Sequence, residues 1–220
     1  MTKVAPTKPL LILLYGFPGS GKTYFARQLT EHLQAAHVHG DRIRGELFDH
    51  PRYDKEENEV IAQLMDYMTG EFLSAGLSVI YDTNAMRAGG RRALRDMARK
   101  SHAQPLLIWF QIDTESSFAR TQVRDRRRSD DKFAIPYDRA TFDRIAGYMQ
   151  NPHNEDYIVI SGKHSFPTQL SAIMKRLREL GDVPSSNEVS AKVVKPGLVN
   201  LIPNPAAGRV DMARRNIMIR

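Results

Sequence analysis

The segment Gly16–Thr23 constrains the fold of this chain more than any other. Its sequence, Gly-Phe-Pro-Gly-Ser-Gly-Lys-Thr, fits the pattern G-x-x-x-x-G-K-[ST], in which glycines let backbone N–H groups point inward at phosphate oxygens. The apolar run Leu10–Tyr15 precedes it, as expected for a strand buried on both faces, and the periodic segment Lys22–Gln34 follows, as expected for a helix. A strand, a glycine-rich loop and a helix in this order predict a site for the phosphates of a nucleoside triphosphate.

The residues of this loop have separate expected tasks. Lys22 is expected to reach the β- and γ-phosphates, and the Thr23 hydroxyl is expected to bind Mg²⁺. The positive N-terminal end of the following helix adds to the attraction for phosphate. We therefore expect ATP and Mg²⁺ as cofactors, with the nucleotide bound by Gly16, Pro18, Gly19, Ser20, Gly21, Lys22 and Thr23.

Apolar runs and helical periodicities alternate along the rest of the chain. Further strands are expected at 36–39, 78–81, 106–112 and 157–160, and further helices at 54–75, 88–101, 114–128, 137–150 and 166–180. This alternation predicts an α/β fold, a five-stranded parallel sheet with helices on both faces. Scattered prolines break the periodicity after Gly181, so we expect a domain at 1–180 and a tail at 181–220 that is partly disordered or docked.

The composition excludes several classes of protein. The chain has no cysteine, which rules out structural disulfides and a cysteine nucleophile. Its longest apolar run is too short to cross a bilayer and lacks a signal-peptide cleavage site, so we expect a cytoplasmic protein without a membrane partner. The net charge of +7 permits an anionic partner without proving one.

Polar residues follow the second expected strand at its carboxyl end, where ligands of open parallel sheets bind. Asp41 lies directly beyond this strand, and Arg44 lies one helical turn further on. A carboxylate here can accept the proton of an attacking hydroxyl, while an arginine holds an anionic part of the acceptor. We expect Asp41 to be catalytic and Arg44 to bind the acceptor; the alternative is a helix cap beside a surface arginine.

A second carboxylate, Asp82, follows the apolar strand 78–81. An aspartate in this position predicts a Mg²⁺ ligand that acts together with Thr23, directly or through water. Thr83 and Asn84 come next, where they could contact the acceptor. The alternative for these three residues is a turn or a helix cap.

Arginines recur at helical spacing in the segment 114–128. Arg120, Arg124 and Arg127 share one face, and like charges repel unless an anion lies between them. Guanidinium groups closing over a triphosphate would neutralise the transferred charge and exclude water. We expect all three to bind the nucleotide and Arg124 to be catalytic; a solvated basic face is the alternative.

A second basic stripe and a pair of histidines carry weaker signals. Arg87, Arg91, Arg95 and Arg99 follow i,i+4 spacing, which indicates either a solvated helix face or a track for a phosphate backbone. The pattern His37-x-His39-x-Asp41 resembles the start of a metallo-hydrolase ligand set, but position 42 is arginine where that motif needs histidine. We expect no metal site there and place both histidines on one face of a strand.

Together these motifs resemble the small P-loop kinases that include the kinase domain of phage polynucleotide kinase, zeta-toxin-like kinases and chloramphenicol phosphotransferase. The resemblance rests on Gly16–Thr23, Asp41–Arg44, Val79–Asn84 and Arg120–Arg128. It implies an AAA-type ATP-binding domain with a three-layer P-loop NTPase fold and an arginine-bearing lid at about 114–136. It also implies that Asp41 is the general base and that the lid arginines contact ATP.

The sequence therefore predicts a kinase that transfers the γ-phosphoryl group of ATP to a hydroxyl acceptor. A polynucleotide 5′-hydroxyl is slightly favoured over a nucleotide sugar, an antibiotic or another small metabolite. A regulatory ATPase that changes partners is the alternative from another class, although no clear residue for orienting water is evident. A nucleic-acid-binding module with a vestigial nucleotide site is disfavoured by the intact Lys22, Thr23 and Asp82.

Overall fold

The computed structural model describes residues 3–84, 86–124, 132–133 and 137–184. All of them belong to the compact unit Met1–Pro184. The domain does not stop at residue 180, because the Thr7 N–H donates a 2.9 Å hydrogen bond to the Asp182 carbonyl and Val183 is buried in the core. The rest of the predicted tail, from residue 185, lies outside the described residues.

Five parallel strands form one sheet. They are β1 (Leu10–Tyr15), β2 (Ala35–His39), β3 (Ser78–Asn84), β4 (Gln104–Gln111) and β5 (Tyr157–Ser161), in the spatial order β2-β3-β1-β4-β5. Because β1 lies in the middle with a strand on each side and helices on both faces, every one of its side chains is buried. This confirms the predicted fold class.

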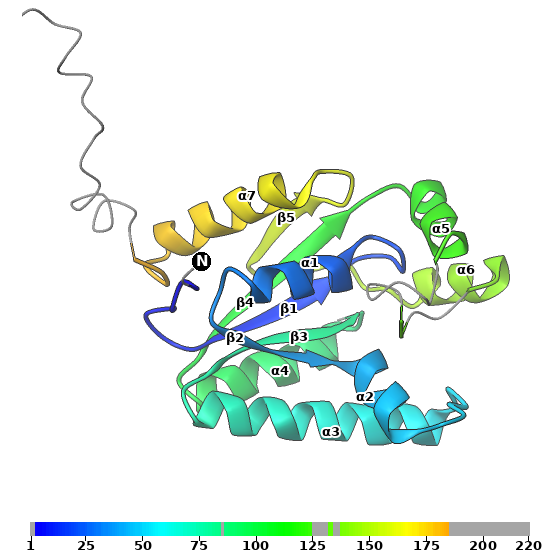
Figure 1. Cartoon of the computed structure of the whole chain (residues 1–220), viewed down its shortest axis with the longest axis horizontal. Helices are drawn as coiled ribbons and strands as arrows, with labels where there is room; N and C mark the ends of the chain where they lie inside the picture. Colours follow the sequence, from blue (N-terminus) through cyan, green and yellow to red (C-terminus); the bar gives the residue numbers. More distant parts are fainter. Residues whose placement is uncertain (1–2, 85, 125–131, 134–136, 185–220) are drawn as a thin grey trace, which may run out of the picture. The chain divides into compact units, whose positions relative to one another are not determined.

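Helices cover both faces of this sheet (Figure 1). They are α1 (Lys22–Thr30), α2 (Gly40–Leu47), α3 (Lys55–Ser74), α4 (Ala88–Lys100), α5 (Thr114–Gln122), α6 (Arg139–Gly147) and α7 (Phe166–Glu179). The helix predicted at 114–128 is described only as far as Gln122, with Val123 as its C-cap, and residues 125–128 lie outside the described part of the chain.

The sheet separates two apolar clusters. On the side of α1 and α7, Leu10, Ile12 and Leu14 pack with residues such as Phe25 and Ile173. On the side of α3 and α4, Leu11, Leu13 and Tyr15 pack with a second set that includes Met65 and Leu94. The alternation along β1 explains why its sequence is apolar without a gap.

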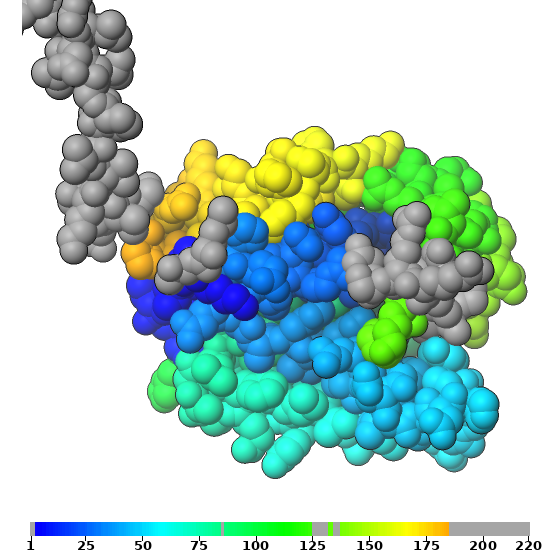
Figure 2. Space-filling view, viewed as in Figure 1, coloured from blue at the N-terminus to red at the C-terminus, as the bar shows by residue number. Residues whose placement is uncertain are grey.

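All five strands point in one direction, so their carboxyl ends form a single edge (Figure 1). The loop 16–21, the first turn of α2, the end of β3 and the start of α5 meet at this edge. Figure 2 shows α5 and α6 in green and the segment of α2 in blue at the same end of the molecule. The fold thus gathers the predicted site residues where parallel α/β sheets bind ligands. No helix of the described residues is long and apolar enough to span a membrane.

Candidate active site

The phosphate loop closes around the side chain of Lys22. Its Nζ donates hydrogen bonds of 2.8 Å to the carbonyls of Gly16 and Phe17 and lies 3.4 Å from Ser20 Oγ. Burial lowers the pKa of Lys22 to about 8, with the charge of Arg124 acting in the same direction and those of Asp82 and Asp41 opposing it. Lys22 is therefore an ammonium group with little water around it, held at the loop that would receive phosphates.

The loop also depends on glycine and on α5. Gly19 has φ of +84°, and a Cβ at this position would lie 2.3 Å from the Ser117 carbonyl oxygen. Ser117 Oγ in turn donates a 2.8 Å hydrogen bond to the Pro18 carbonyl. Helix α5 is thus packed directly on the loop, which any larger residue at position 19 would push away.

Thr23 and Asp82 form the oxygen pair that the sequence predicts for Mg²⁺. Thr23 Oγ1 donates a 3.2 Å hydrogen bond to Asp82 Oδ1, and Asp82 is only 3% exposed. Mg²⁺ prefers hydroxyl, carboxylate and water oxygens, and this pair joins the first turn of α1, after the phosphate loop, to the end of β3. The residues present therefore fit the ion.

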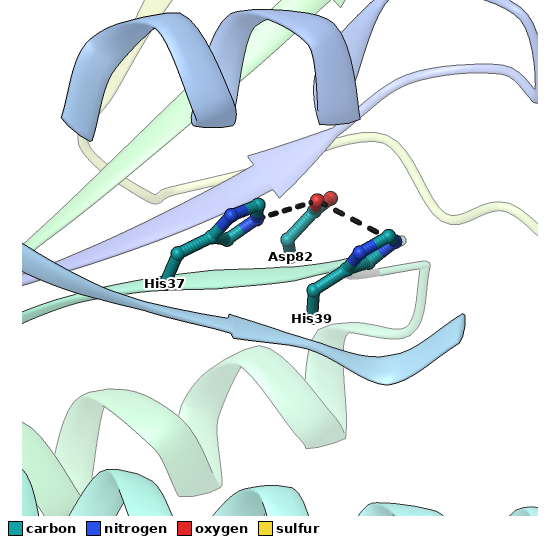
Figure 3. A group of neighbouring side chains, drawn as sticks. All are labelled: His37, His39 and Asp82. Carbon is teal, nitrogen blue, oxygen red and sulfur yellow. Dashed lines mark hydrogen bonds and ion pairs between the residues drawn. The ribbon is translucent and has the colours of Figure 1, made fainter. Parts of the chain in front are cut away.

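The second carboxylate oxygen of Asp82 faces two histidines of β2 (Figure 3). Asp82 Oδ2 lies 2.8 Å from His37 Nε2 and 3.8 Å from His39 Nε2. The two imidazole rings are stacked, with centroids 5.3 Å apart and planes 6° apart. As expected, the histidines share one face of the strand.

Asp41 stands in the first turn of α2 at the same edge of the sheet. Burial raises the pKa of its carboxyl group, which the nearby charges of His39, Arg44 and Arg124 counteract. The Asp41 carboxylate also acts electrostatically on Lys22. Asp41, the base predicted from the sequence, and Lys22 of the phosphate loop are therefore close enough for their charges to interact.

Residues 11–152 match the AAA domain family. This is well over half of the chain. The chain belongs to this family. No curated protein matches the sequence.

Solved structures similar to this AAA domain protein support the P-loop kinase fold. Kti12 of Chaetomium thermophilum in complex with ADP-AlF3 has a TM-score of 0.58 and 16% identity, over 80% of this chain and 100% of that one. The APS kinase CysC of Mycobacterium tuberculosis with AMPPNP and APS has a TM-score of 0.57 and 16% identity, over 79% and 99%. A gluconokinase of Sinorhizobium meliloti has a TM-score of 0.56 and 14% identity, over 79% and 94%. At these identities the likeness concerns the fold, and the narrower resemblance to the polynucleotide kinase and zeta-toxin group stays a prediction.

Arg44, predicted to bind the acceptor, is buried in this AAA domain and held by neighbouring residues. Its guanidinium pairs with Glu57, donates a 2.6 Å hydrogen bond to Asn58 Oδ1 and lies 4.7 Å from the centre of the Tyr53 ring. Glu57 lies in the first turn of α3, and its N–H donates a hydrogen bond to the side chain of the N-cap Asp54, in the D-x-x-E pattern of a helix start. That pattern could have located Glu57, but not its pairing with Arg44.

The other two predicted acceptor contacts lie at the end of β3. Asn84 Oδ1 accepts a 3.3 Å hydrogen bond from the Gly16 N–H, and Asn84 Nδ2 lies 3.8 Å from Met149 Sδ. Thr83 is exposed one residue earlier. Asn84 thus holds the start of the phosphate loop, and the roles of both residues toward an acceptor stay predictions.

The predicted lid arginines have different surroundings. Arg120 donates a 2.7 Å hydrogen bond to the Gly162 carbonyl, in the loop after β5. Arg124 lies over the Tyr137 ring at 5.9 Å and acts electrostatically on Lys22 and Asp41, which places its charge at the site. Arg127 lies outside the described residues.

Two aromatic residues near Asp41 and α2 were not predicted from the sequence, because they belong to no motif. Phe133 packs against Gly45 of α2 and edge-on against the His39 ring, at 6.3 Å between centroids. Burial and the charge of Asp41 raise the pKa of Tyr137 to about 12, so its hydroxyl stays protonated beside that carboxylate. Aromatic side chains thus line the site on the side of α2.

Part of the second basic stripe is neutralised inside the domain. Arg91 is fully buried and donates hydrogen bonds of 2.7–3.1 Å to the Glu155 carboxylate, to which Arg95 is also paired. Arg99 pairs with Asp96. The i,i+4 spacing therefore reflects a helix, α4, that packs on the domain through ion pairs, and it does not indicate an open track for phosphates.

Proposed function

We propose that this AAA domain protein is a kinase that transfers the γ-phosphoryl group of ATP to a hydroxyl group of a small metabolite. The proposal depends on one relationship above all. Asp41, a carboxylate whose pKa burial raises, shares the carboxyl edge of the sheet with Lys22 and Arg124. A base beside a triphosphate site suits a protonated acceptor oxygen, whereas a phosphate acceptor would need no base.

The transfer would proceed by in-line displacement. The acceptor oxygen forms a bond to the γ-phosphorus while the bond between that phosphorus and the bridging oxygen breaks, and ADP leaves. Asp41 takes the proton of the acceptor hydroxyl, and Lys22 and Arg124 stabilise the charge on the phosphoryl oxygens. Thr23 and Asp82 would hold Mg²⁺, which when bound neutralises charge on the β- and γ-phosphates.

The acceptor is proposed to be small because several of the arginines that would favour a polynucleotide are paired with carboxylates. Glu155 engages Arg91 and Arg95, and Glu57 engages Arg44. Near Asp41, whose charge acts on Tyr137, the aromatic rings of Phe133 against His39 and of Tyr53 under Arg44 suit a compact molecule with hydroxyl groups. The similar structures described as a gluconokinase and an APS kinase carry names of small acceptors.

A transfer screen with γ-labelled ATP tests the proposal. The acceptor panel should contain sugars, sugar acids, nucleosides and aminoglycosides next to 5′-hydroxyl DNA and RNA. Label appearing in a small acceptor, and lost in Asp41→Asn, supports the proposal. Label appearing only in a polynucleotide would show that the acceptor is a nucleic acid and not a small metabolite. Release of inorganic phosphate without any acceptor, at the same rate as with the best acceptor, would favour a regulatory ATPase.

A further inference from the structure

We propose that His37, His39 and Asp82 form a binding site for a divalent transition-metal ion, of which Zn²⁺ is the representative. The three side chains project from β2 and β3 to the side of the sheet where α1 lies (Figure 3). Their ligand atoms all lie within 4.8 Å of one another, and no other such group of three occurs among the described residues. The third ligand comes from a neighbouring strand, which is why the chain pattern around position 42 does not reveal it.

The distances suit a tetrahedral ion. Ligands about 2.0–2.1 Å from Zn²⁺ are about 3.3–3.4 Å from one another. The distances from Asp82 Oδ2 to the two Nε2 atoms, 2.8 Å to His37 and 3.8 Å to His39, bracket this value. The ligand atoms of the two imidazoles also lie within 4.8 Å of each other, so that rotation of the rings would bring all three ligands to one ion, with a fourth position left for water or a phosphate oxygen.

The ligand types select the kind of metal. Two imidazoles and one carboxylate suit Zn²⁺, Co²⁺ or Ni²⁺, whereas Mg²⁺ prefers oxygen ligands alone. The chain has no cysteine, and its seven histidines all lie in the described part of the chain, where no other such group of three ligands occurs. Thr23 donates to Oδ1 of Asp82, which fixes the carboxylate and leaves Oδ2 directed at the histidines.

The shared carboxylate couples this site to the nucleotide. Asp82 cannot offer its full charge to Mg²⁺ while it binds an ion held by the two histidines. Zn²⁺ is therefore expected to inhibit phosphoryl transfer in the presence of Mg²⁺, an expectation that rests on the proposed function. The binding site itself does not depend on that function.

Metal titration of the full-length protein without a histidine tag tests the site. The absorption of Co²⁺ and the binding heat of Zn²⁺ should each indicate one ion per chain in the presence of excess Mg²⁺. His37→Ala and His39→Ala should each weaken the affinity on the order of 100-fold, because each removes a direct ligand. His153→Ala removes an exposed histidine and should leave the affinity unchanged.

Each outcome of the titration is informative. No stoichiometric binding, or equal binding by both variants and the unchanged protein, overturns the proposal. His37 is partly exposed, so His37→Gln offers a milder second variant should His39→Ala not fold, and circular dichroism in EDTA checks the fold of each.

Inhibition tests the coupling to the nucleotide. In each variant the transfer rate with Zn²⁺ is divided by the rate without it, so that any direct effect of the histidines cancels. A ratio well below one in the unchanged protein that returns toward one in His37→Ala supports the coupling, and equal ratios overturn it. If no acceptor is found at all, the kinase proposal fails while the Co²⁺ titration still decides the metal site.

Discussion

Ser117 of α5 donates a hydrogen bond to the Pro18 carbonyl, which ties the helix leading to Arg120 and Arg124 directly to the phosphate loop. The contact is close because Gly19 has no side chain and approaches the Ser117 carbonyl. A conformational change of the loop upon nucleotide binding is therefore expected to shift α5, where the predicted lid starts.

Gly19→Ala is expected to damage this contact and to weaken nucleotide binding. Its Cβ would lie 2.3 Å from the Ser117 oxygen, so the loop and α5 must move apart. We expect a loss of about 1–3 kcal/mol of stability, typical of overpacking, and a lower affinity for ATP. Gly21→Ala is the control, since Gly21 shares the positive φ but its Cβ would meet nothing within 4 Å. Equal loss of ATP affinity in both variants, measured by calorimetry, would assign the effect to backbone strain alone.

Glu155→Ala is expected to destabilise the domain strongly. The variant leaves the fully buried Arg91 without the carboxylate of its ion pair, and breaking a buried ion pair in this way costs about 3–5 kcal/mol. Glu59→Ala, which breaks an exposed pair with Lys55, should change stability by about 0.5 kcal/mol or less. Urea denaturation measures both, and a similar small loss in the two variants would contradict the structural role of Glu155.

The same pair makes stability depend on pH. Burial would raise the pKa of Glu155, but hydrogen bonds from Arg91 and Arg95 outweigh it and lower the pKa. A lowered carboxyl pKa contributes stability above the ordinary value, and this contribution disappears as the pH falls through the lowered value. In Glu155→Ala this part of the acid destabilisation should be missing from the pH profile of the urea midpoint.

The sheet and its helices were predictable because their signals are local. The apolar run of β1, the glycine loop and the periodicity of α3 each specify one element, and parallel pairing follows from their alternation. Helix ends were less so. The helix expected over 137–150 is α6 at Arg139–Gly147. Its N-cap is Asp138, whose side chain accepts a hydrogen bond from the Thr141 N–H, so the first helical residue is Arg139.

Contacts between distant segments were not predictable from the sequence. The pairing of Arg44 with Glu57 depends on how α2 meets α3, and that of Arg91 with Glu155 joins residues far apart in the chain. From the sequence spacing alone, both arginines were predicted to be exposed or to face a ligand. The third ligand beside His37 and His39 likewise comes from the register of β2 with β3, in which His39 lies opposite Asp82.

Nucleotide binding should depend on pH through Lys22. Burial lowers its pKa to about 8 in the free protein, so the ammonium group loses its proton above that pH. Phosphates favour the charged form, so binding raises the pKa and takes up a proton when the free lysine is neutral. The affinity for ADP should thus fall above pH 8, by up to about tenfold per pH unit. Calorimetry in buffers of different ionisation enthalpy measures the uptake directly.

Lys22→Arg is the matched control for that measurement. A guanidinium group stays protonated over the whole range, so the fall in affinity above pH 8 should be absent even if the affinity at pH 7 is lower. A pH dependence unchanged by this substitution would assign the titration to another group.

Asp41→Asn separates a catalytic role for Asp41 from a structural one. The amide is nearly isosteric but cannot take the acceptor proton, so kcat should fall by roughly 10²–10⁴ while ATP affinity changes only a few-fold. Because burial raises the pKa of Asp41, the acid limb of kcat in the unchanged protein should lie above the ordinary aspartate value of about 3.9, and this limb should vanish in Asp41→Asn. Arg42→Gln, one residue further on the exposed side of α2, controls for changes in local charge. Equal losses of ATP affinity and kcat would show that Asp41 supports the nucleotide site and takes no proton.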